Sequence, residues 1–236
     1  MKIFASWSGG KESCLATYKA LSQGHEVLYL VNFISEDGER SSSHGIKASV
    51  LALQAEAIGI PLIQVKTSWE NYEENFKRIV RELKGKGVQG GVFGDMELEE
   101  HREWVERVCT ELEIKAFLPL WGIEPEELID EFLKLKFKAM VIATTLEEGL
   151  LGKVLDKALV SQVTKLGSHP CGESGEYHTF VTAGPIFKKA LKVTQGKKER
   201  RDKVWFLEIS AEVIARGKAP KQSQRGKSKI ATLRSQ

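Results

Sequence analysis

Apolar residues follow two alternating patterns over the first two-thirds of the chain. Short buried-strand runs are predicted at residues 2–7, 26–33, 62–66, 88–94, 116–118 and 139–144, and helical apolar spacing at 11–23, 46–58, 70–83, 98–112 and 125–136. Gly24 and Gly59 stand where two of these helices end, and Pro125 stands where one begins. A regular alternation of strand and helix predicts an α/β fold, in which a doubly wound parallel sheet has helices on both faces.

The pattern changes after Thr145. A helix is predicted over 154–165, an irregular segment over 168–185, and two β segments over 186–194 and 203–214, separated by a charged turn. We therefore expect an N-terminal domain of residues 1–145 and a smaller C-terminal α+β lobe of residues 146–215. Residues 216–236 form a third, basic segment.

Charge is distributed unevenly along the chain. The net charge is +3, but residues 216–236 contain seven lysines and arginines and no acid, so the preceding 215 residues carry −4. We interpret the basic segment as a disordered, solvated tail, with an electrostatic arm for RNA as the sharper alternative. The acidic body weighs against a nucleic-acid substrate.

Composition excludes several classes of protein. No run of about 18 apolar residues occurs, so no membrane-spanning helix is expected, and the first residues lack the pattern of a signal peptide. Cys14, Cys109 and Cys171 are odd in number and far apart, which argues against a disulfide framework or a Cys-rich zinc site. We expect a cytoplasmic protein, and a homo-oligomer is compatible with the sequence.

The loop Ser8-Gly9-Gly10-Lys11-Glu12-Ser13 joins the first strand to the first helix. In an open α/β sheet, ligands bind at the carboxyl ends of the strands, and a helix N-terminus attracts phosphate. The loop is not a Walker A motif, because that motif needs glycine at Ala5 and Ser or Thr at Glu12, and it is not a GxGxxG loop either. The pattern instead resembles the PP-loop of the N-type ATP pyrophosphatases, and this resemblance implies that the loop holds the pyrophosphate portion of ATP.

Other polar residues are expected at the same rim of the sheet. His44 follows the second strand, Phe33 ends that strand, and Gly94-Asp95 ends another. These residues are candidates to contact the nucleotide, and Asp95 is a candidate to contact Mg²⁺ or a ribose. Arg102, one turn into the next helix, is a candidate to neutralise phosphate charge. The alternatives are a solvated loop histidine and a surface helix arginine.

The segment from His169 to Thr179 reads HPCGESGEYHT. Two acids, two histidines and a thiol on a Gly-rich loop are typical of a functional segment. A zinc site from His169, Cys171 and His178 fits no standard ligand spacing. A nucleophilic Cys171 is a further alternative, although no neighbouring residue in the sequence marks it as activated.

Four features together resemble the diphthine–ammonia ligase family of PP-loop ATP pyrophosphatases: the SGGxxS loop, the Gly94-Asp95 turn followed by arginine, Pro119-Leu120-Trp121, and residues 172–177. The resemblance covers nearly all of residues 1–215 and implies a HUP-like, adenine nucleotide alpha hydrolase-like fold. It also implies that ATP, Mg²⁺ and ammonium are used to amidate the carboxylate of diphthine on elongation factor 2. An acyl-adenylate forms, and AMP and pyrophosphate are released.

The resemblance assigns roles to three groups of residues. The catalytic candidates are Lys11, Glu12, Asp95 and Arg102, with Glu12 and Asp95 facing the metal. The nucleotide-binding candidates are Ser8, Gly9, Gly10, Lys11, Ser13, Phe33, His44 and Gly94. The substrate-binding candidates are Gly172, Glu173, Gly175, Glu176 and Tyr177. The two glutamates are expected to oppose the trimethylammonium group of diphthine, and Tyr177 or a nearby tryptophan to add a cation–π contact.

Two points stay open at this level. The family usually has Asp at the position of Glu12, so the role of the longer acid is unsettled. Two other functions also fit the loop: a tRNA-modifying PP-loop enzyme of the thiolation or lysidine type, and a non-catalytic adenine-nucleotide sensor. The absence of CxxC pairs weighs against thiolation.

Overall fold

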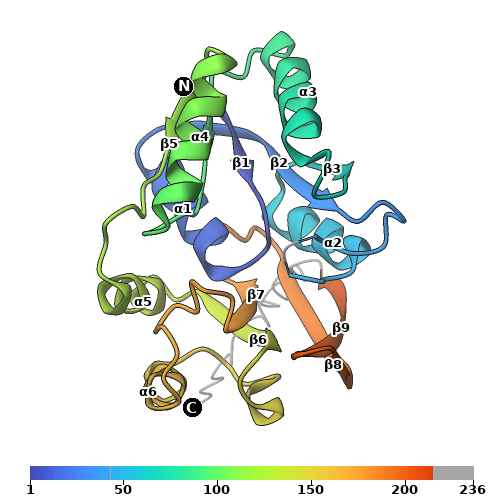
Figure 1. Ribbon diagram of the computed structural model, residues 1–236, viewed down its shortest axis with the longest axis vertical. Coiled ribbons are helices and arrows are strands. Elements are labelled where there is room, and N and C mark those ends of the chain that lie inside the picture. Colours follow the sequence, from blue (N-terminus) through green and yellow to red (C-terminus); the bar gives the residue numbers. More distant parts are fainter. Residues whose placement is uncertain (43, 215–236) are drawn as a thin grey trace, which may run out of the picture.

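A computed structural model describes residues 1–42 and 44–214 (Figure 1). Five parallel strands form the first sheet in the order β3-β2-β1-β4-β5. Their bounds are β1 Lys2–Ser6, β2 Glu26–Ile34, β3 Leu62–Lys66, β4 Gly90–Val92 and β5 Lys115–Phe117. The central strand is an unbroken apolar run, with Ile3, Phe4 and Ala5 fully buried, because helices cover both faces of the sheet.

Helices cover the two faces in pairs, as the doubly wound prediction requires. The helices are α1 Lys11–Ser22, α2 Ala48–Ile58, α3 Tyr72–Gly85, α4 Glu99–Glu111 and α5 Pro125–Lys134. The side chains of α3 and α4 pack in one apolar core with Phe4, and those of α1 and α2 pack in another with Ile3 and Ala5. Side chains of consecutive residues in β1 therefore pack in the cores on opposite faces of the sheet. The predicted α/β class is confirmed.

The second sheet is antiparallel and has the order β7-β6-β9-β8. Its strands are β6 Lys138–Thr144, β7 Tyr177–Ala183, β8 Ala190–Arg201 and β9 Val204–Ile214. The prediction that residues 139–144 continue the parallel sheet is wrong. An apolar run buried on both faces has the same pattern in either sheet, and only its pairing with β7 and β9 decides. The change of sheet lies before β6, one strand earlier than the predicted domain boundary at residue 145.

Two further predictions in this region need correction. Residues 177–183 fall in the segment predicted to be irregular but form β7, in which Thr179, Phe180 and Val181 are buried against β6. The charged stretch after Thr194 is not the predicted turn but continues β8 to Arg201, paired with β9. The reversal is instead at Asp202, whose φ is +53°. Charges are tolerated along β8 because it is an edge strand.

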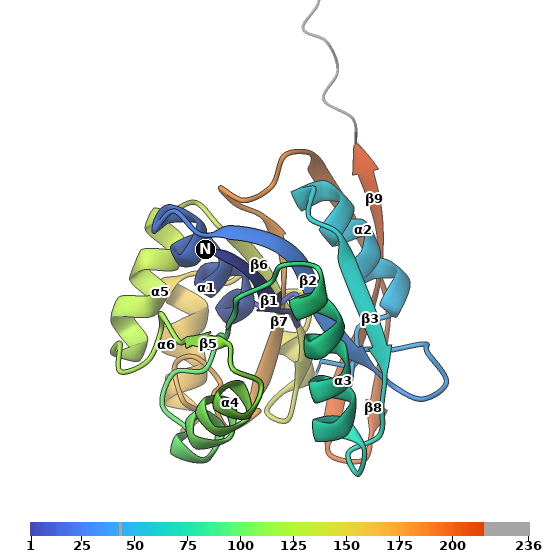
Figure 2. The same ribbon diagram turned by 90° about the horizontal axis from the view of Figure 1, so that it is seen from above.

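The helices α1 and α2 lie between the two sheets (Figures 1 and 2). Their core includes Val181 of β7 and Ile209 of β9, so one apolar cluster joins both parts of the chain. The short helices η1 Glu148–Leu150 and α6 Lys157–Lys165 complete the second part, and Asp156 caps α6 through the Leu159 N–H. No helix within the described ranges is long and apolar enough to span a membrane. The basic segment 216–236 lies outside the described residues.

Candidate nucleotide and substrate site

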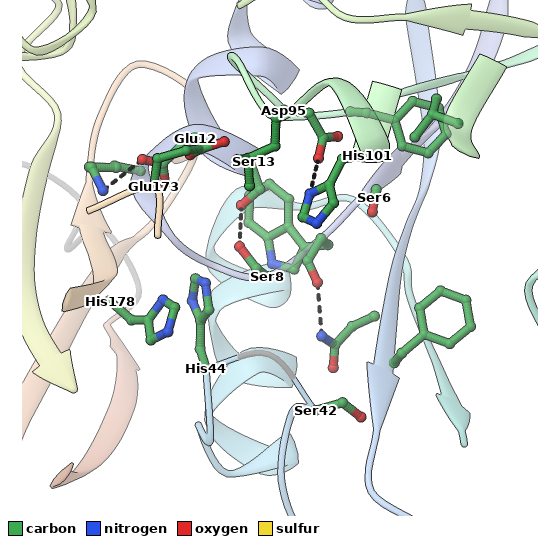
Figure 3. Close-up of a pocket in the computed structure, with 18 of the residues that line it drawn as sticks. Ser6, Ser8, Glu12, Ser13, Ser42, His44, Asp95, His101, Glu173 and His178 are labelled. Carbon is green, nitrogen blue, oxygen red and sulfur yellow. Dashed lines mark hydrogen bonds and ion pairs between the residues drawn. The ribbon is translucent and has the colours of Figure 1, made fainter. Parts of the chain in front are cut away.

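A cavity of about 520 Å³ lies at the carboxyl ends of β1, β2 and β4 (Figure 3). The strand order of the sheet changes direction at this point, because β1 pairs with β2 on one side and with β4 on the other. Such a crevice is where open α/β sheets bind ligands. The cavity is lined by the loop from Ser8 to Ser13, called the phosphate loop below, and by the loops after β2 and β4. Residues 171–173 and 177–179, from the C-terminal part that contains the antiparallel sheet, also line it. The fold therefore brings the two sequence motifs to one cavity.

The phosphate loop needs glycine at two positions. Gly9 has φ of +80°, and a Cβ there would lie 2.5 Å from Leu51 Cδ2. A Cβ on Gly10 would lie 2.6 Å from His44 Cε1. Gly10 is also the N-cap of α1, and no side chain caps the helix there. The Ser8 and Ser13 hydroxyls are 3.2 Å apart beside this helix N-terminus, and a helix N-terminus with neighbouring hydroxyls suits a phosphate.

The phosphate loop is hydrogen-bonded to β7 of the second part. The Val181 N–H donates to Gly9 O at 3.0 Å, and the Lys11 N–H donates to Thr179 Oγ1 at 3.1 Å. The Lys11 Nζ donates to Cys171 O at 2.6 Å. These bonds span more than 150 residues of sequence, so the second motif holds the first in place.

Gln54 is a residue that sequence reasoning missed. Its side chain is fully buried on α2; Nε2 donates to Gly9 O at 3.1 Å and to Val181 O at 2.7 Å, and Oε1 accepts from Trp7 Nε1 at 3.1 Å. One amide thus ties the loop, the end of β1 and β7 together. A glutamine within a helical apolar pattern carries no sequence signal for this role.

Lys11 is buried with its charge compensated. Its Nζ lies 2.6 Å from Glu12 Oε1 and 4.7 Å from the centre of the Tyr177 ring. Burial is the largest single influence on Lys11 and lowers its pKa, but the charge and hydrogen bond of Glu12 together with Tyr177 and Cys171 raise the pKa above its usual value, so the ammonium persists at neutral pH. Lys11 takes the cation–π face of Tyr177, whose hydroxyl donates to Pro170 O. One face of the Tyr177 ring is therefore occupied by the Lys11 ammonium.

Three carboxylates, Glu12, Asp95 and Glu173, line the same side of the cavity. Asp95 Oδ1 is 3.2 Å from His101 Nδ1, and this contact raises the pKa of His101. Burial, followed by the negative charges of Glu12 and Asp95, raises the pKa of Glu173 to about 7. In the part of the chain that the structure describes, no group of three or more His, Cys, Asp or Glu side chains is placed to hold a metal ion. A Mg²⁺ ion carried by phosphates needs only one or two carboxylates, and Glu12 and Asp95 are the candidates from the sequence that line the cavity.

The remaining predicted residues divide into two groups. Phe33, His44, Gly94 and Gly172 line the cavity, whereas Gly175, Glu176 and Arg102 do not. Glu176 is a support for the loop, because its Oε1 accepts from the His169 N–H at 3.0 Å. The Arg102 guanidinium donates to Glu106 at 2.8 Å and stacks on Trp121, so the structure places it on the surface of α4.

Cys171 is not an activated nucleophile in this structure. Burial raises the pKa of its thiol to about 12, and its Sγ lies 3.6 Å from Pro125 O. The thiolate is therefore scarce at neutral pH. The contribution of this residue to the site is its carbonyl oxygen, which accepts from Lys11.

An aromatic wall of Phe33, Tyr72, Phe76 and Trp104 lines the cavity on the side of α3 and α4, and sequence reasoning identified only Phe33 of it. The Phe33 and Tyr72 rings are 4.6 Å apart, and Phe76 and Trp104 are 5.1 Å apart. Trp104 Nε1 donates to Glu73 Oε2 at 2.8 Å, which fixes the indole. Aromatic residues at helical spacing are usually part of a core, and only the tertiary structure shows that these line a cavity.

Polar atoms without partners face the aromatic wall and the phosphate loop. Asn32 Oδ1, Ser42 Oγ and His44 Nδ1 are buried and have no hydrogen-bond partner in the structure. All three residues line the cavity. Buried polar groups of a native protein are normally paired with protein or with ordered water, so these atoms are available to bond a water or a polar ligand in the cavity. An aromatic wall, unpaired polar atoms and a phosphate loop in one cavity fit an adenine nucleotide.

Comparison with protein families agrees with this site. Residues 1–116 match the diphthamide synthase N-terminal domain, and residues 124–218 match the diphthamide synthase C-terminal domain. The chain belongs to the diphthine–ammonia ligase (diphthamide synthase) family. The family resemblance inferred from the motifs is confirmed, and the interval between the two matched domains coincides with the change of sheet before β6.

Relatives with this name are similar over most of this chain. The diphthine–ammonia ligase of Homo sapiens is 30% identical over 219 residues, which cover 81% of this chain and 82% of that protein. That of Schizosaccharomyces pombe is 29% identical over 239 residues, or 89% of this chain, but the chain spans only 39% of the yeast protein. A solved structure, a predicted subunit of tRNA methyltransferase from Methanocaldococcus jannaschii, covers 78% of this chain and 98% of its own at 13% identity, with a TM-score of 0.44.

Proposed function

We propose that this protein uses ATP and ammonium to amidate the carboxylate of diphthine on elongation factor 2, through an acyl-adenylate, with release of AMP and pyrophosphate. The observation that carries the proposal is the direct bonding of the two family motifs in one cavity, through Lys11 to Cys171 and Thr179. A carboxylate does not react with ammonia unless its oxygen is converted to a leaving group. Adenylation makes AMP that leaving group.

The cavity divides into regions that suit the parts of ATP. The loop from Ser8 to Ser13 and the N-terminus of α1 suit the pyrophosphate portion, since they combine N–H groups, hydroxyls and a buried ammonium. The aromatic wall with Asn32 and Ser42 suits the adenine ring. Mg²⁺ held by Glu12 and Asp95 would supply charge neutralisation on the leaving pyrophosphate.

Glu173 is the residue we assign to the cationic substrates. It lines the cavity beside Glu12 and Asp95, whereas Glu176 is bonded to the His169 backbone outside it. The pKa of Glu173 near 7 means that an arriving quaternary ammonium or ammonium ion favours its ionised form. The expectation from the sequence that both glutamates oppose the trimethylammonium group thus narrows to Glu173.

Two variants distinguish the proposed role of Glu173 from that of Glu176. Glu173→Gln should lower amidation at least a hundredfold and leave ATP affinity within about threefold. Glu176→Ala, which removes the acceptor for the His169 N–H, should weaken the fold of the loop, with ATP and acceptor affected together. Equal amidation by the Glu173→Gln variant and the wild-type protein would show that the substrate charge is met elsewhere.

The function itself is tested by incubating the full chain with ATP, Mg²⁺, ammonium and elongation factor 2 carrying diphthine. Mass spectrometry should show conversion of acid to amide on the modified histidine, with one AMP formed per amide. Formation of AMP with a tRNA acceptor, and none with diphthine, would support a tRNA-modifying enzyme. ATP binding with no acceptor-dependent AMP would support a nucleotide sensor.

A further inference from the structure

Two histidines from distant parts of the chain stack beside the phosphate loop. His44 follows β2 and His178 lies in β7; their ring centres are 4.4 Å apart and the rings are inclined by 28° (Figure 3). Both line the cavity. Neither residue is accounted for by the roles assigned above to the loop, the aromatic wall and the carboxylates.

The position of the pair is set by the phosphate loop itself. His44 Cε1 lies so near Gly10 that a Cβ on Gly10 would be 2.6 Å from it. His44 Nδ1 is buried without a hydrogen-bond partner. An imidazole therefore covers the N-cap of α1, with an unsatisfied nitrogen in a cavity whose loop is built for anions.

Burial, more than the neighbouring charges, favours the neutral form of both rings in the absence of a ligand. Burial, then the neighbouring His178 and Lys11, lowers the pKa of His44, and a bond to the Thr179 backbone opposes this only in part. Burial and Lys11 likewise lower the pKa of His178, against Glu12 and Glu176. Behind His44, a small cavity is lined by Arg40, Lys47 and Glu208, which contribute charges of both signs.

We propose that His44 and His178 together form a proton-linked phosphate contact: when the pyrophosphate portion of ATP enters the loop, the pair binds one proton and its charge faces the anion. The proposal rests on the proposed function, because it assumes that the loop binds pyrophosphate. One proton is expected because two stacked imidazolium ions would repel at this separation. His178 stands next to Tyr177, so the same strand would couple the nucleotide to the substrate motif.

The chain is suited to a direct test, because it has five histidines: His25, His44, His101, His169 and His178. The ring Cε1–H signals are followed by NMR from pH 5 to 9, with and without inorganic pyrophosphate, whose binding is measured separately by calorimetry. Substitution of His25, His101 and His169 in turn assigns the pair by elimination, so neither His44 nor His178 has to be changed for the assignment.

With pyrophosphate, the titration midpoint of the pair should rise by at least one pH unit, with one proton bound. By linkage, a rise of one pH unit means that pyrophosphate binds the protonated pair at least tenfold more tightly than the neutral pair. Adenosine, which has no phosphate, should leave the midpoint unchanged. His178→Phe keeps a stacked ring that cannot be protonated, and should bind pyrophosphate at least tenfold more weakly than the wild type at pH 6 but equally at pH 9.

Two outcomes would overturn the inference in different ways. Pyrophosphate that binds while the pair stays neutral would refute the proton-linked contact and leave the proposed function intact. A change of midpoint at His101 alone, beside Asp95, would refute the contact in the same way. No pyrophosphate binding at all would overturn both this inference and the nucleotide site on which it rests.

Discussion

Gln54→Leu is the substitution for which the structure gives the sharpest energetic expectation. Leucine has a similar volume, so the change removes three buried hydrogen bonds with little change in packing. At about 1 kcal/mol net for each bond, the loss is about 3 kcal/mol. The cost is largest for Trp7 Nε1, a lone donor that stays buried without its acceptor, whereas Gly9 O keeps its bond from the Val181 N–H.

The loss should be visible in two measurements. The free energy of unfolding from urea titration should fall by about 3 kcal/mol, which is about a hundredfold in the unfolding equilibrium. Pyrophosphate affinity should fall as well, since Gln54 anchors Gly9 in the phosphate loop. Gln64→Leu is the matched control: Gln64 is half-buried and makes one bond, to Ala48 O at 3.0 Å, so about 1 kcal/mol or less is expected without a change in affinity.

Coupling between Gln54 and Trp7 separates the hydrogen bond from packing. Trp7→Phe removes the indole N–H, so the double variant should lose less than the sum of the two single losses, by about 1 kcal/mol. A loss below about 1 kcal/mol for Gln54→Leu, with unchanged pyrophosphate affinity, would refute the reasoning. It would mean that the bonds from β7 alone hold the loop.

Three further predictions concern the phosphate loop, the carboxylates and the aromatic wall, and a fourth concerns α4. Gly10→Ala should reduce pyrophosphate affinity at least tenfold, measured by calorimetry, because its Cβ would displace His44. The pKa of Glu173 is raised from its usual 4.5 to about 7, so between these pH values the folded state binds a proton that the unfolded state does not, and stability should fall as pH rises through that range. In urea titrations at pH 5 and pH 8, Glu173→Gln should show a smaller change in stability with pH and should be more stable than the wild type at pH 8. Trp104→Ala should weaken adenosine binding by about 1–3 kcal/mol in fluorescence titrations, with pyrophosphate binding unchanged. Arg102→Ala should leave AMP formation within about twofold, and a larger loss would return Arg102 to the catalytic group.

Local pattern determined much of the fold. The strand–helix alternation, the loop from Ser8 to Ser13 at the end of β1, and the turn at Gly94-Asp95 are readable because each depends on residues close together in sequence. Burial on both faces makes the parallel strands apolar throughout, and phosphate binding requires glycine at the start of a helix. Family membership followed from the same short motifs.

Strand pairing was decided by tertiary structure alone. The buried run of β6 suits either sheet, and only its antiparallel partners exclude it from the parallel one. The strand β7 was not predicted, because the Gly- and Pro-rich residues before Tyr177 are typical of a loop and the β-branched stretch that follows them is short. The charges of β8 likewise resemble a turn unless the strand is known to lie at an edge.

The candidate site likewise has one part that the sequence determined and another that only the tertiary structure decided. The loop from Ser8 to Ser13, which we propose binds phosphate, is recognisable from the sequence because its residue types and their spacing occur together in one short segment. The tertiary structure decided that Tyr177 lies under Lys11, that Glu173 enters the cavity while Glu176 supports its loop, and that Gln54 and the His44–His178 pair contact the loop at all. The physical reason is that these contacts join residues far apart in the chain, so their energies depend on the packing of α1 and α2 between the two sheets and leave no periodic trace in the sequence.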